Sequence, residues 1–132
     1  MNILQKVKAL NLPTDQYVLV GGGVLAAHKI REAPDIDLVV TQALFDEMKR
    51  TGEWREGEKP NGGPALYKDE IEVYLDVNCD SYNPTTQELI ERAESIEGIQ
   101  VISLHDLLKF KRGYGRPKDR VDIELIEKVL AK

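Results

Sequence analysis

The chain has 132 residues, with 18 lysines and arginines against 23 aspartates and glutamates, and a net charge of −5 at neutral pH. This acidic balance excludes a general nucleic-acid binder, because neutralising phosphates requires an excess of basic residues, and we expect no general DNA binding. Apolar residues (42%) and charged residues (31%) occur in the proportions of a soluble globular protein. The length predicts a single domain, residues 1–132, with one hydrophobic core.

No apolar run approaches the roughly 20 residues that a membrane-spanning helix needs. The N-terminal segment MNILQKVKAL also lacks the long apolar region of a signal peptide. Cys79 is the only cysteine, which excludes an intrachain disulfide and a cysteine metal cluster. We therefore expect a cytoplasmic protein without a membrane segment, in which Cys79 is a small buried apolar residue.

The N-terminal part of the chain predicts a helix, a strand, a second helix and a second strand. Residues 2–10 place apolar side chains on one helical face, and residues 17–20 (YVLV) form a short apolar strand. The three glycines at 21–23 predict a turn, since no regular element tolerates three glycines well. The alanine-rich residues 24–30 predict a short helix, and residues 36–40 (IDLVV) predict an apolar strand.

Helices and strands alternate through the rest of the predicted structure. Residues 53–64 are polar and glycine-rich, which indicates a surface loop or hairpin. The helical patterns, opened by capping residues such as Thr41 and the Thr85/Glu88 capping box, cover residues 42–50, 86–95, 104–112 and 117 onward. The strand patterns cover residues 65–68, 71–78 and 99–102. This order implies an α/β or α+β fold, in which helices flank a small mixed β-sheet and the C-terminus is helical.

Asp35 and Asp37 are the first candidates for chemistry. Residues two apart in a strand point to the same side, so the two carboxylates repel each other unless a cation lies between them. Oxygen ligands suit Mg²⁺ or Mn²⁺, and Mg²⁺ typically binds one or two carboxylates together with substrate phosphates. Alternatively, Asp37 faces solvent on a half-exposed strand. The apolar neighbours Ile36 and Leu38 favour a buried strand, whose aspartates then need a partner.

The glycines Gly21, Gly22 and Gly23 form a second candidate site. A junction from strand through glycines to helix presents backbone N–H groups to an anion such as a phosphate. The glycine spacing matches neither the Walker loop nor the dinucleotide-binding fingerprint. A tight turn without a ligand is therefore the alternative interpretation.

A third carboxylate is expected on the strand predicted at residues 71–78. Glu72, Tyr74 and Asp76 share one face of that strand. Asp76 lies between apolar residues, much as Asp37 does, which favours Asp76 as the third ligand with Glu72 as the alternative. The alternative interpretation, that this face of the strand is solvated and binds no ligand, also stays open. It applies more to Glu72 than to Asp76.

Residues 103–122 form a basic segment in an otherwise acidic chain. Lys111, Arg116 and Lys118 flank a glycine turn at 113–115, from which they can reach triphosphate oxygens. The alternative is a solvated helix end, where the negative end of the helix dipole stabilises cations.

Together these residues resemble the polymerase-β-type nucleotidyltransferase superfamily. The resemblance is carried by Val20-Gly21-Gly22-Gly23, by Arg31, by Asp35-Ile36-Asp37-Leu38 and by Leu75-Asp76-Val77. The tail resembles the C-terminal motif of small bacterial nucleotidyltransferases, including abortive-infection toxins of toxin–antitoxin systems, through Lys111, Gly115-Arg116-Pro117-Lys118-Asp119 and Asp122. The resemblance implies the nucleotidyltransferase fold.

The resemblance also implies roles for individual residues. Asp35, Asp37 and Asp76 would hold one or two Mg²⁺ ions, and Lys111 would offset developing charge. The triphosphate would contact Gly21, Gly22, Gly23, Arg31, Arg116 and Lys118. Such an enzyme would move a nucleoside monophosphate from a nucleoside triphosphate to a hydroxyl of an RNA, a protein or a small molecule.

Two other interpretations stay open. The chain can retain the fold as a non-catalytic nucleotide-binding module, or it can be a subunit of a toxin–antitoxin complex. If the chain is instead an active enzyme, the acceptor-holding surface of larger relatives would come from another subunit, either a helical partner protein or a second copy of the chain.

Overall fold

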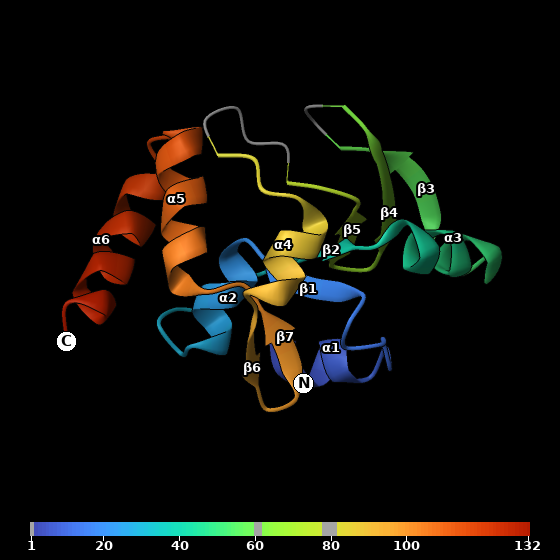
Figure 1. Cartoon of the computed structure of the whole chain (residues 1–132), viewed down its shortest axis with the longest axis horizontal. Coiled ribbons are helices and arrows are strands. Elements are labelled where there is room, and N and C mark those ends of the chain that lie inside the picture. Colours follow the sequence, from blue (N-terminus) through green and yellow to red (C-terminus); the bar gives the residue numbers. More distant parts are fainter. Residues whose placement is uncertain (1, 60–61, 78–81) are drawn as a thin grey trace.

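The computed structural model describes residues 2–59, 62–77 and 82–132 (Figure 1). Cys79 and the predicted end of a strand at Asn78 lie outside these residues. Within them the chain forms a seven-stranded sheet in the order β3-β4-β5-β2-β1-β7-β6. The strands are β1 (Tyr17–Val20), β2 (Ile36–Val40), β3 (Arg55–Glu58), β4 (Pro64–Lys68), β5 (Ile71–Tyr74), β6 (Glu94–Ile96) and β7 (Ile99–Val101).

The sheet is mixed, as predicted. At its centre β2 runs antiparallel to β1 and parallel to β5, and β1 runs parallel to β7. The two outer pairs, β3 with β4 and β6 with β7, are antiparallel hairpins. The predicted α+β class is therefore confirmed.

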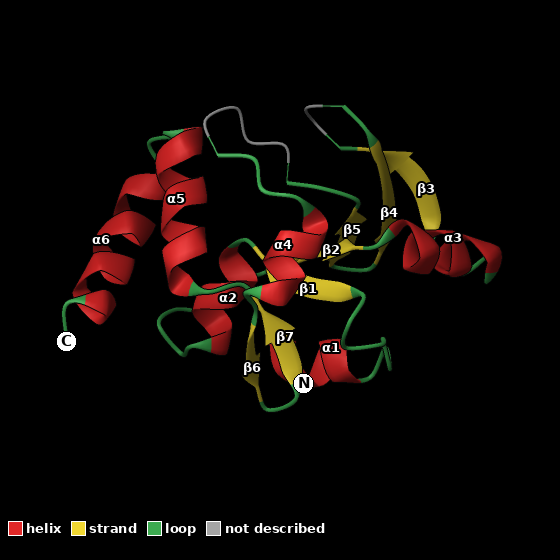
Figure 2. Cartoon of the chain, in the orientation of Figure 1, coloured by secondary structure: helices red, strands yellow, loops and turns green. Residues whose placement is uncertain are grey.

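Six helices complete the described structure (Figure 2). They are α1 (Ile3–Lys8), α2 (Gly22–Ala27), α3 (Gln42–Arg50), α4 (Thr86–Glu91), α5 (Leu104–Tyr114) and α6 (Asp119–Leu130). Helices α5 and α6 pack side by side at one end of the molecule, and α3 lies near the β3–β4 hairpin at the other end (Figure 1). No helix among the described residues is both long and apolar enough to cross a membrane.

The central strands β1 and β2 form the middle of the core. All four residues of β1 are buried, and in β2 only Asp37 keeps partial exposure. This near-continuous burial follows from the apolar runs YVLV and IDLVV, which have covered faces on both sides. Asp37 is thus a carboxylate placed on one of the most buried strands of the protein.

Several sequence predictions of secondary structure are wrong. Gly22 and Gly23, predicted to lie in a turn, begin helix α2, and the strand predicted over residues 71–78 ends at Tyr74. The helix predicted to reach about Ser95 ends at Glu91, and residues 94–96 form strand β6. The reason is a tight turn at Glu97 (φ 50°) and Gly98 (φ 84°), whose positive φ values suit a two-residue hairpin connection. The helix predicted to end at about Arg112 is also longer than expected. Helix α5 continues to Tyr114, and Gly115 ends it in the left-handed conformation.

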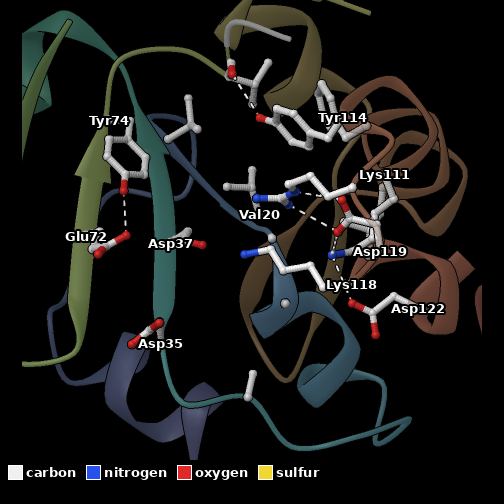
Figure 3. Close-up of a pocket in the computed structure, with 18 of the residues that line it drawn as sticks. Val20, Asp35, Asp37, Glu72, Tyr74, Lys111, Tyr114, Lys118, Asp119 and Asp122 are labelled. Atoms are coloured by element: carbon white, nitrogen blue, oxygen red, sulfur yellow. Dashed lines mark hydrogen bonds and ion pairs between the residues drawn. The ribbon is translucent and has the colours of Figure 1, made fainter. Parts of the chain in front are cut away.

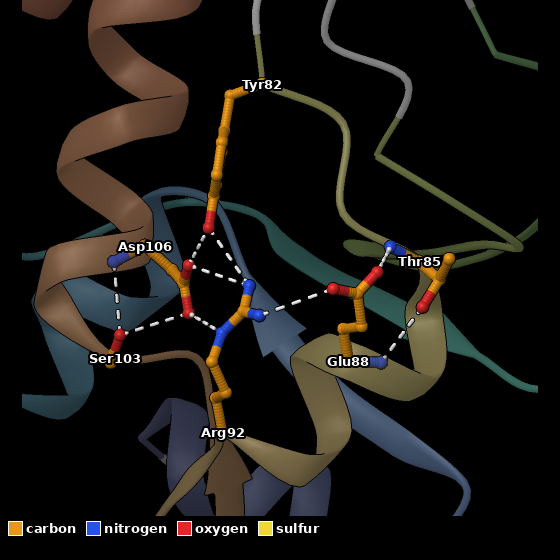
Figure 4. Close-up of polar contacts among 6 residues, drawn as sticks. All are labelled: Tyr82, Thr85, Glu88, Arg92, Ser103 and Asp106. Atoms are coloured by element: carbon orange, nitrogen blue, oxygen red, sulfur yellow. Dashed lines mark hydrogen bonds and ion pairs between the residues drawn. The ribbon is translucent and has the colours of Figure 1, made fainter.

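A polar cluster ties α5 to the segment around α4 (Figure 4). The buried Asp106 carboxylate accepts hydrogen bonds from Arg92, with Nη2 to Oδ1 at 3.1 Å and Nε to Oδ2 at 3.2 Å. The Tyr82 hydroxyl also donates to Asp106, and Ser103 caps the helix at Asp106 N. This cluster fixes the start of α5, whose later residues line the site described next.

Candidate active site

A pocket of about 810 Å³ lies between the central strands and the α5–α6 pair (Figure 3). This volume is within the range of small-molecule sites. One wall is built by β2 and β5, and the opposite wall by the end of α5 and the beginning of α6. The floor includes the junction between β1 and α2.

Carboxylates line the strand wall. Asp37 on β2 is the direct register neighbour of Glu72 on β5, so their side chains share one face of the sheet. Asp35 lies immediately before β2, is exposed, and lines the same pocket. The structure thus brings Asp35 and Asp37 together, as the sequence predicts, and adds Glu72 beside them.

The environment of Asp37 is unusual for a carboxylate. Burial, reinforced by the neighbouring Glu72 and Asp35, raises the pKa of Asp37 to about 7, although the charge of Lys111 opposes this. Its Oδ1 atom is buried and accepts no hydrogen bond from any described residue. An unpartnered carboxylate oxygen beside a second carboxylate fits a divalent cation, whose charge removes the repulsion.

The carboxylates alone do not enclose a metal ion. No three His, Cys, Asp or Glu side chains in residues 2–59, 62–77 and 82–132 are grouped closely enough to do so. A Mg²⁺ ion bound here would need waters and substrate phosphates to complete its shell.

Asp76 and Glu72 occupy different positions in the pocket. Strand β5 ends at Tyr74, so Asp76 lies beyond it, with 55% of its side chain exposed. Its carboxylate forms an ion pair with Lys59, a buried residue at the end of β3 that the sequence analysis did not single out. Asp76 lines the pocket but is engaged by a cation, whereas Glu72 lies next to Asp37.

Tyr74 is a further residue to which sequence reasoning assigned no role. Its hydroxyl donates a hydrogen bond of 2.5 Å to Glu72 Oε2. Burial, together with this bond to Glu72, raises the pKa of Tyr74 above its ordinary value. The alternation of the strand indicated that Tyr74 and Glu72 share a face, but it could not indicate the bond.

The three glycines have different surroundings. Gly21 (φ 69°) precedes α2, and a Cβ atom there would lie 2.6 Å from Asp37 Oδ2. Gly22 begins α2 and lies against the Arg31 guanidinium, while Gly23 packs on Leu19 in the core. Gly21 and Gly22 line the pocket, and Gly23 is not among its lining residues.

The helical wall carries a connected ion network. Lys111 Nζ lies 3.2 Å from Asp119 Oδ1 and 3.0 Å from Asp122 Oδ2, with all three side chains buried. Arg31 forms a two-point contact with Asp122, and Arg116 forms one with Asp119. Hydrogen bonds from Arg31 hold the pKa of the Asp122 carboxyl below its usual range. The cations predicted from the tail therefore line the pocket, but two of them, Lys111 and Arg116, already have carboxylate partners, as does Arg31.

Lys118 differs from these three cations. It lies at the beginning of α6, is exposed, lines the pocket, and forms no ion pair with another described residue. In Figure 3 its ammonium extends from the helical wall toward the carboxylates. A cation without a carboxylate partner, opposite an acidic wall, is well placed for an anionic ligand.

Comparison of the sequence with protein-family models and with curated proteins gave no match. Solved structures do match. One is a Thermotoga maritima protein described provisionally as a nucleotidyltransferase, with 18% identity, 99% of this chain and 96% of that chain covered, and a TM-score of 0.57. Another is the nucleotidyltransferase ANT(2″)-Ia in complex with adenylyl-2″-tobramycin, with 18% identity, 98% and 86% coverage, and a TM-score of 0.59. The chain has the nucleotidyltransferase fold.

The fold implied by the sequence motifs is thereby confirmed. The two nucleotidyltransferase structures cover nearly the entire chain, including the α5–α6 pair that carries the basic wall. Neither of them is described as a toxin, so the predicted link to toxin–antitoxin systems stays a prediction.

Proposed function

We propose that the protein is a metal-dependent nucleotidyltransferase, which moves a nucleoside monophosphate from a nucleoside triphosphate to a hydroxyl of an acceptor. One observation carries this proposal. Asp37, on a buried strand, has an unpartnered carboxylate oxygen and a second carboxylate, Glu72, as its register neighbour. A divalent cation would remove the repulsion within this pair. The nucleotidyltransferase fold and the cationic wall across the pocket support a nucleotide as the ligand that comes with the cation.

In this proposal Asp35, Asp37 and Glu72 hold Mg²⁺ or Mn²⁺. Glu72 replaces Asp76 as the preferred third carboxylate, because Asp76 is engaged by Lys59 and lies beyond the end of β5. When bound, the metal supplies charge that offsets the triphosphate and acidifies the acceptor hydroxyl. Without it, the acidic wall would repel the substrate.

The helical wall and the glycine junction bind the triphosphate. Lys118 contacts phosphate oxygens directly, since no carboxylate of the described chain neutralises it. Gly21 and Gly22 let the phosphates approach the backbone closely, which a side chain would prevent. Arg31, Lys111 and Arg116 contribute mainly by holding Asp119 and Asp122, and their excess of positive charge faces the same pocket.

The transfer is a single displacement at the α-phosphorus. The acceptor oxygen forms a bond to the α-phosphorus while the bond from that phosphorus to the bridging α–β oxygen breaks, and pyrophosphate leaves. The proton of the acceptor hydroxyl passes to a carboxylate of the strand wall. The residues of this chain therefore position the reactants and balance charge, with no covalent intermediate on the protein.

The proposal is tested by incubating the protein with α-³²P-labelled nucleoside triphosphates, Mg²⁺ or Mn²⁺, and a panel of acceptors. Small molecules with several hydroxyls come first, because ANT(2″)-Ia is found with an adenylylated tobramycin, and RNA follows. Label in the acceptor, together with released pyrophosphate, is the expected result. The variants Glu72→Gln and Asp76→Asn are compared side by side, with an expected loss of about 100-fold or more for Glu72→Gln and only a small loss for Asp76→Asn.

Other outcomes contradict parts of the proposal. A larger loss in Asp76→Asn than in Glu72→Gln would reverse the assignment of the third carboxylate. Triphosphate binding that survives Asp37→Asn, without transfer to any acceptor, would favour the non-catalytic nucleotide-binding module instead.

A further inference from the structure

Tyr74 and Glu72 lie on the same face of β5, two residues apart, and both line the pocket. In Figure 3 the Tyr74 hydroxyl points along the strand to Glu72, where it donates a hydrogen bond of 2.5 Å to Oε2. We propose that Tyr74 is a positioning residue, which fixes the Glu72 carboxylate in the orientation that binds the divalent cation. This inference rests on the proposed function and adds a residue to it.

Glu72 needs such an anchor because of its length and exposure. A glutamate has several rotatable bonds, and Glu72 is only partly buried, so its carboxylate would otherwise sample several rotamers. A hydrogen bond from a hydroxyl to a carboxylate is among the stronger kinds and holds one oxygen in place. With Oε2 held by Tyr74, Oε1 remains for a ligand beside Asp37.

The phenol is itself well placed for this role. Its neighbours across the sheet are Val39 on β2 and Ala65 on β4, both buried residues. The buried Lys59 ammonium lies 5.9 Å from the centre of the ring, which adds a cation–π contact. The sheet thus holds the backbone of Tyr74, and the ring has a buried cation beside it.

The competing explanation is that Tyr74 only packs in the sheet. Replacing Tyr74 by phenylalanine separates the two explanations, because it keeps the ring and its neighbours but removes the donor. Tyr67 provides a matched control. It lies on β4, opposite Glu72 in register, yet its hydroxyl donates to the Glu58 carbonyl on β3 at 2.7 Å.

The experiment measures Mn²⁺ affinity by electron paramagnetic resonance with each of the four α,β-methylene nucleoside triphosphates. In these analogues a carbon replaces the bridging oxygen at the bond to be broken, so no transfer competes with binding. Tyr74→Phe is expected to weaken Mn²⁺ binding about tenfold, the range found for residues that orient metal ligands. Its melting temperature should stay within about 2 °C of the wild type, and Tyr67→Phe should leave the affinity unchanged.

A double-mutant cycle with Glu72→Ala shows whether Tyr74 acts through Glu72. In the Glu72→Ala background, Tyr74→Phe should change the affinity by less than about twofold, since the group it orients is gone. Equal Mn²⁺ affinity of Tyr74→Phe and the wild type would overturn the inference while leaving the proposed function intact. An equal tenfold loss in the Glu72→Ala background would also overturn it. A wild type that binds Mn²⁺ with none of the four analogues would overturn the proposed function, and the inference with it.

Discussion

The Arg31 guanidinium donates two hydrogen bonds to the Asp122 carboxylate, Nε to Oδ1 at 2.7 Å and Nη2 to Oδ2 at 2.8 Å. The contact joins the loop before β2 to helix α6. Lys111 Nζ on α5 lies 3.0 Å from Asp122 Oδ2. Asp122 therefore forms ion pairs with two cations from two different elements. This contact therefore helps to hold the helical wall of the pocket against the strand half.

Asp122→Asn should destabilise the protein strongly, because an amide cannot balance two neighbouring cations. We expect a loss of about 3 kcal/mol in the free energy of unfolding, the size found when one partner of a buried ion pair is removed. Urea denaturation measures it. Glu127→Gln is the control, since Glu127 pairs with Arg112 at 3.6 Å between exposed side chains and should cost less than about 0.5 kcal/mol. Equal losses in the two variants would contradict a structural role for Asp122.

Gly21→Ala should impair cation binding more than its backbone strain alone explains. An alanine Cβ there would lie 2.6 Å from Asp37 Oδ2 and would displace that carboxylate. Gly52→Ala is a matched control, because Gly52 also has a positive φ (74°) but nothing lies within 4 Å of an added Cβ. Both variants should lose about 1 kcal/mol or more of stability. Only Gly21→Ala should lose Mn²⁺ affinity in calorimetry, and an equal affinity in both would contradict the close approach.

The raised pKa of Asp37 makes the stability of the metal-free protein depend on pH. The folded-state pKa of about 7 exceeds the ordinary value, so the folded protein binds more protons than the unfolded chain between about pH 4 and about pH 7. Stability contributed by Asp37 is therefore present at low pH and is lost as the pH rises through 7. In EDTA, the free energy of unfolding should fall by about 1–3 kcal/mol from about pH 5 to about pH 8.

Asp37→Asn should flatten this pH profile and raise the melting temperature at pH 8 in EDTA. Added Mg²⁺ should stabilise the wild type at pH 8 but not the variant, since a ligand of the folded state alone shifts the equilibrium. Asp35→Asn, at an exposed position, should change the slope much less. A wild type whose stability does not respond to Mg²⁺ would show that the cation does not bind beside Asp37.

The local features of the site were predictable because they depend on short stretches of sequence. The apolar runs on both sides of Asp37 indicated a buried strand, and the glycines after Val20 indicated the junction with a helix. The Thr41 cap and the Thr85/Glu88 capping box both form as expected. Each of these predictions follows from neighbours within a few residues.

The choice between Glu72 and Asp76 was not predictable, because it depends on the register between two strands distant in sequence. Both residues share one face of the predicted strand, but only the parallel pairing of β2 with β5 places Glu72 beside Asp37. Asp76 resembled Asp37 in its apolar neighbours, yet its partner Lys59 comes from the segment predicted as a surface loop or hairpin, in which no residue was expected to reach the site. The partners of Lys111 in α6 likewise come from tertiary packing of two helices.

The Asp106 cluster should control stability in acid. Burial opposes ionisation of Asp106, but hydrogen bonds from Arg92 and Tyr82 outweigh it and hold the pKa of the carboxyl below its usual range. The unfolded chain therefore takes up the proton first as the pH falls. The stability that Asp106 contributes is fully present above its ordinary pKa of about 4, and it is lost as the pH falls through the lower folded value.

Asp106→Asn should cost about 2 kcal/mol in the free energy of unfolding at neutral pH, because the hydrogen bonds from Arg92 and Tyr82 then lose their ionised acceptor. Against the wild type, that difference should stay constant from about pH 8 to about pH 5 and shrink below about pH 4. Urea denaturation across this range measures it. Asp46→Asn, on the exposed face of α3 where Asp46 accepts a hydrogen bond from Gln42, should stay within about 0.5 kcal/mol of the wild type throughout. A difference for Asp106→Asn that persists unchanged at pH 3 would contradict a stabilising role for the ionised carboxylate.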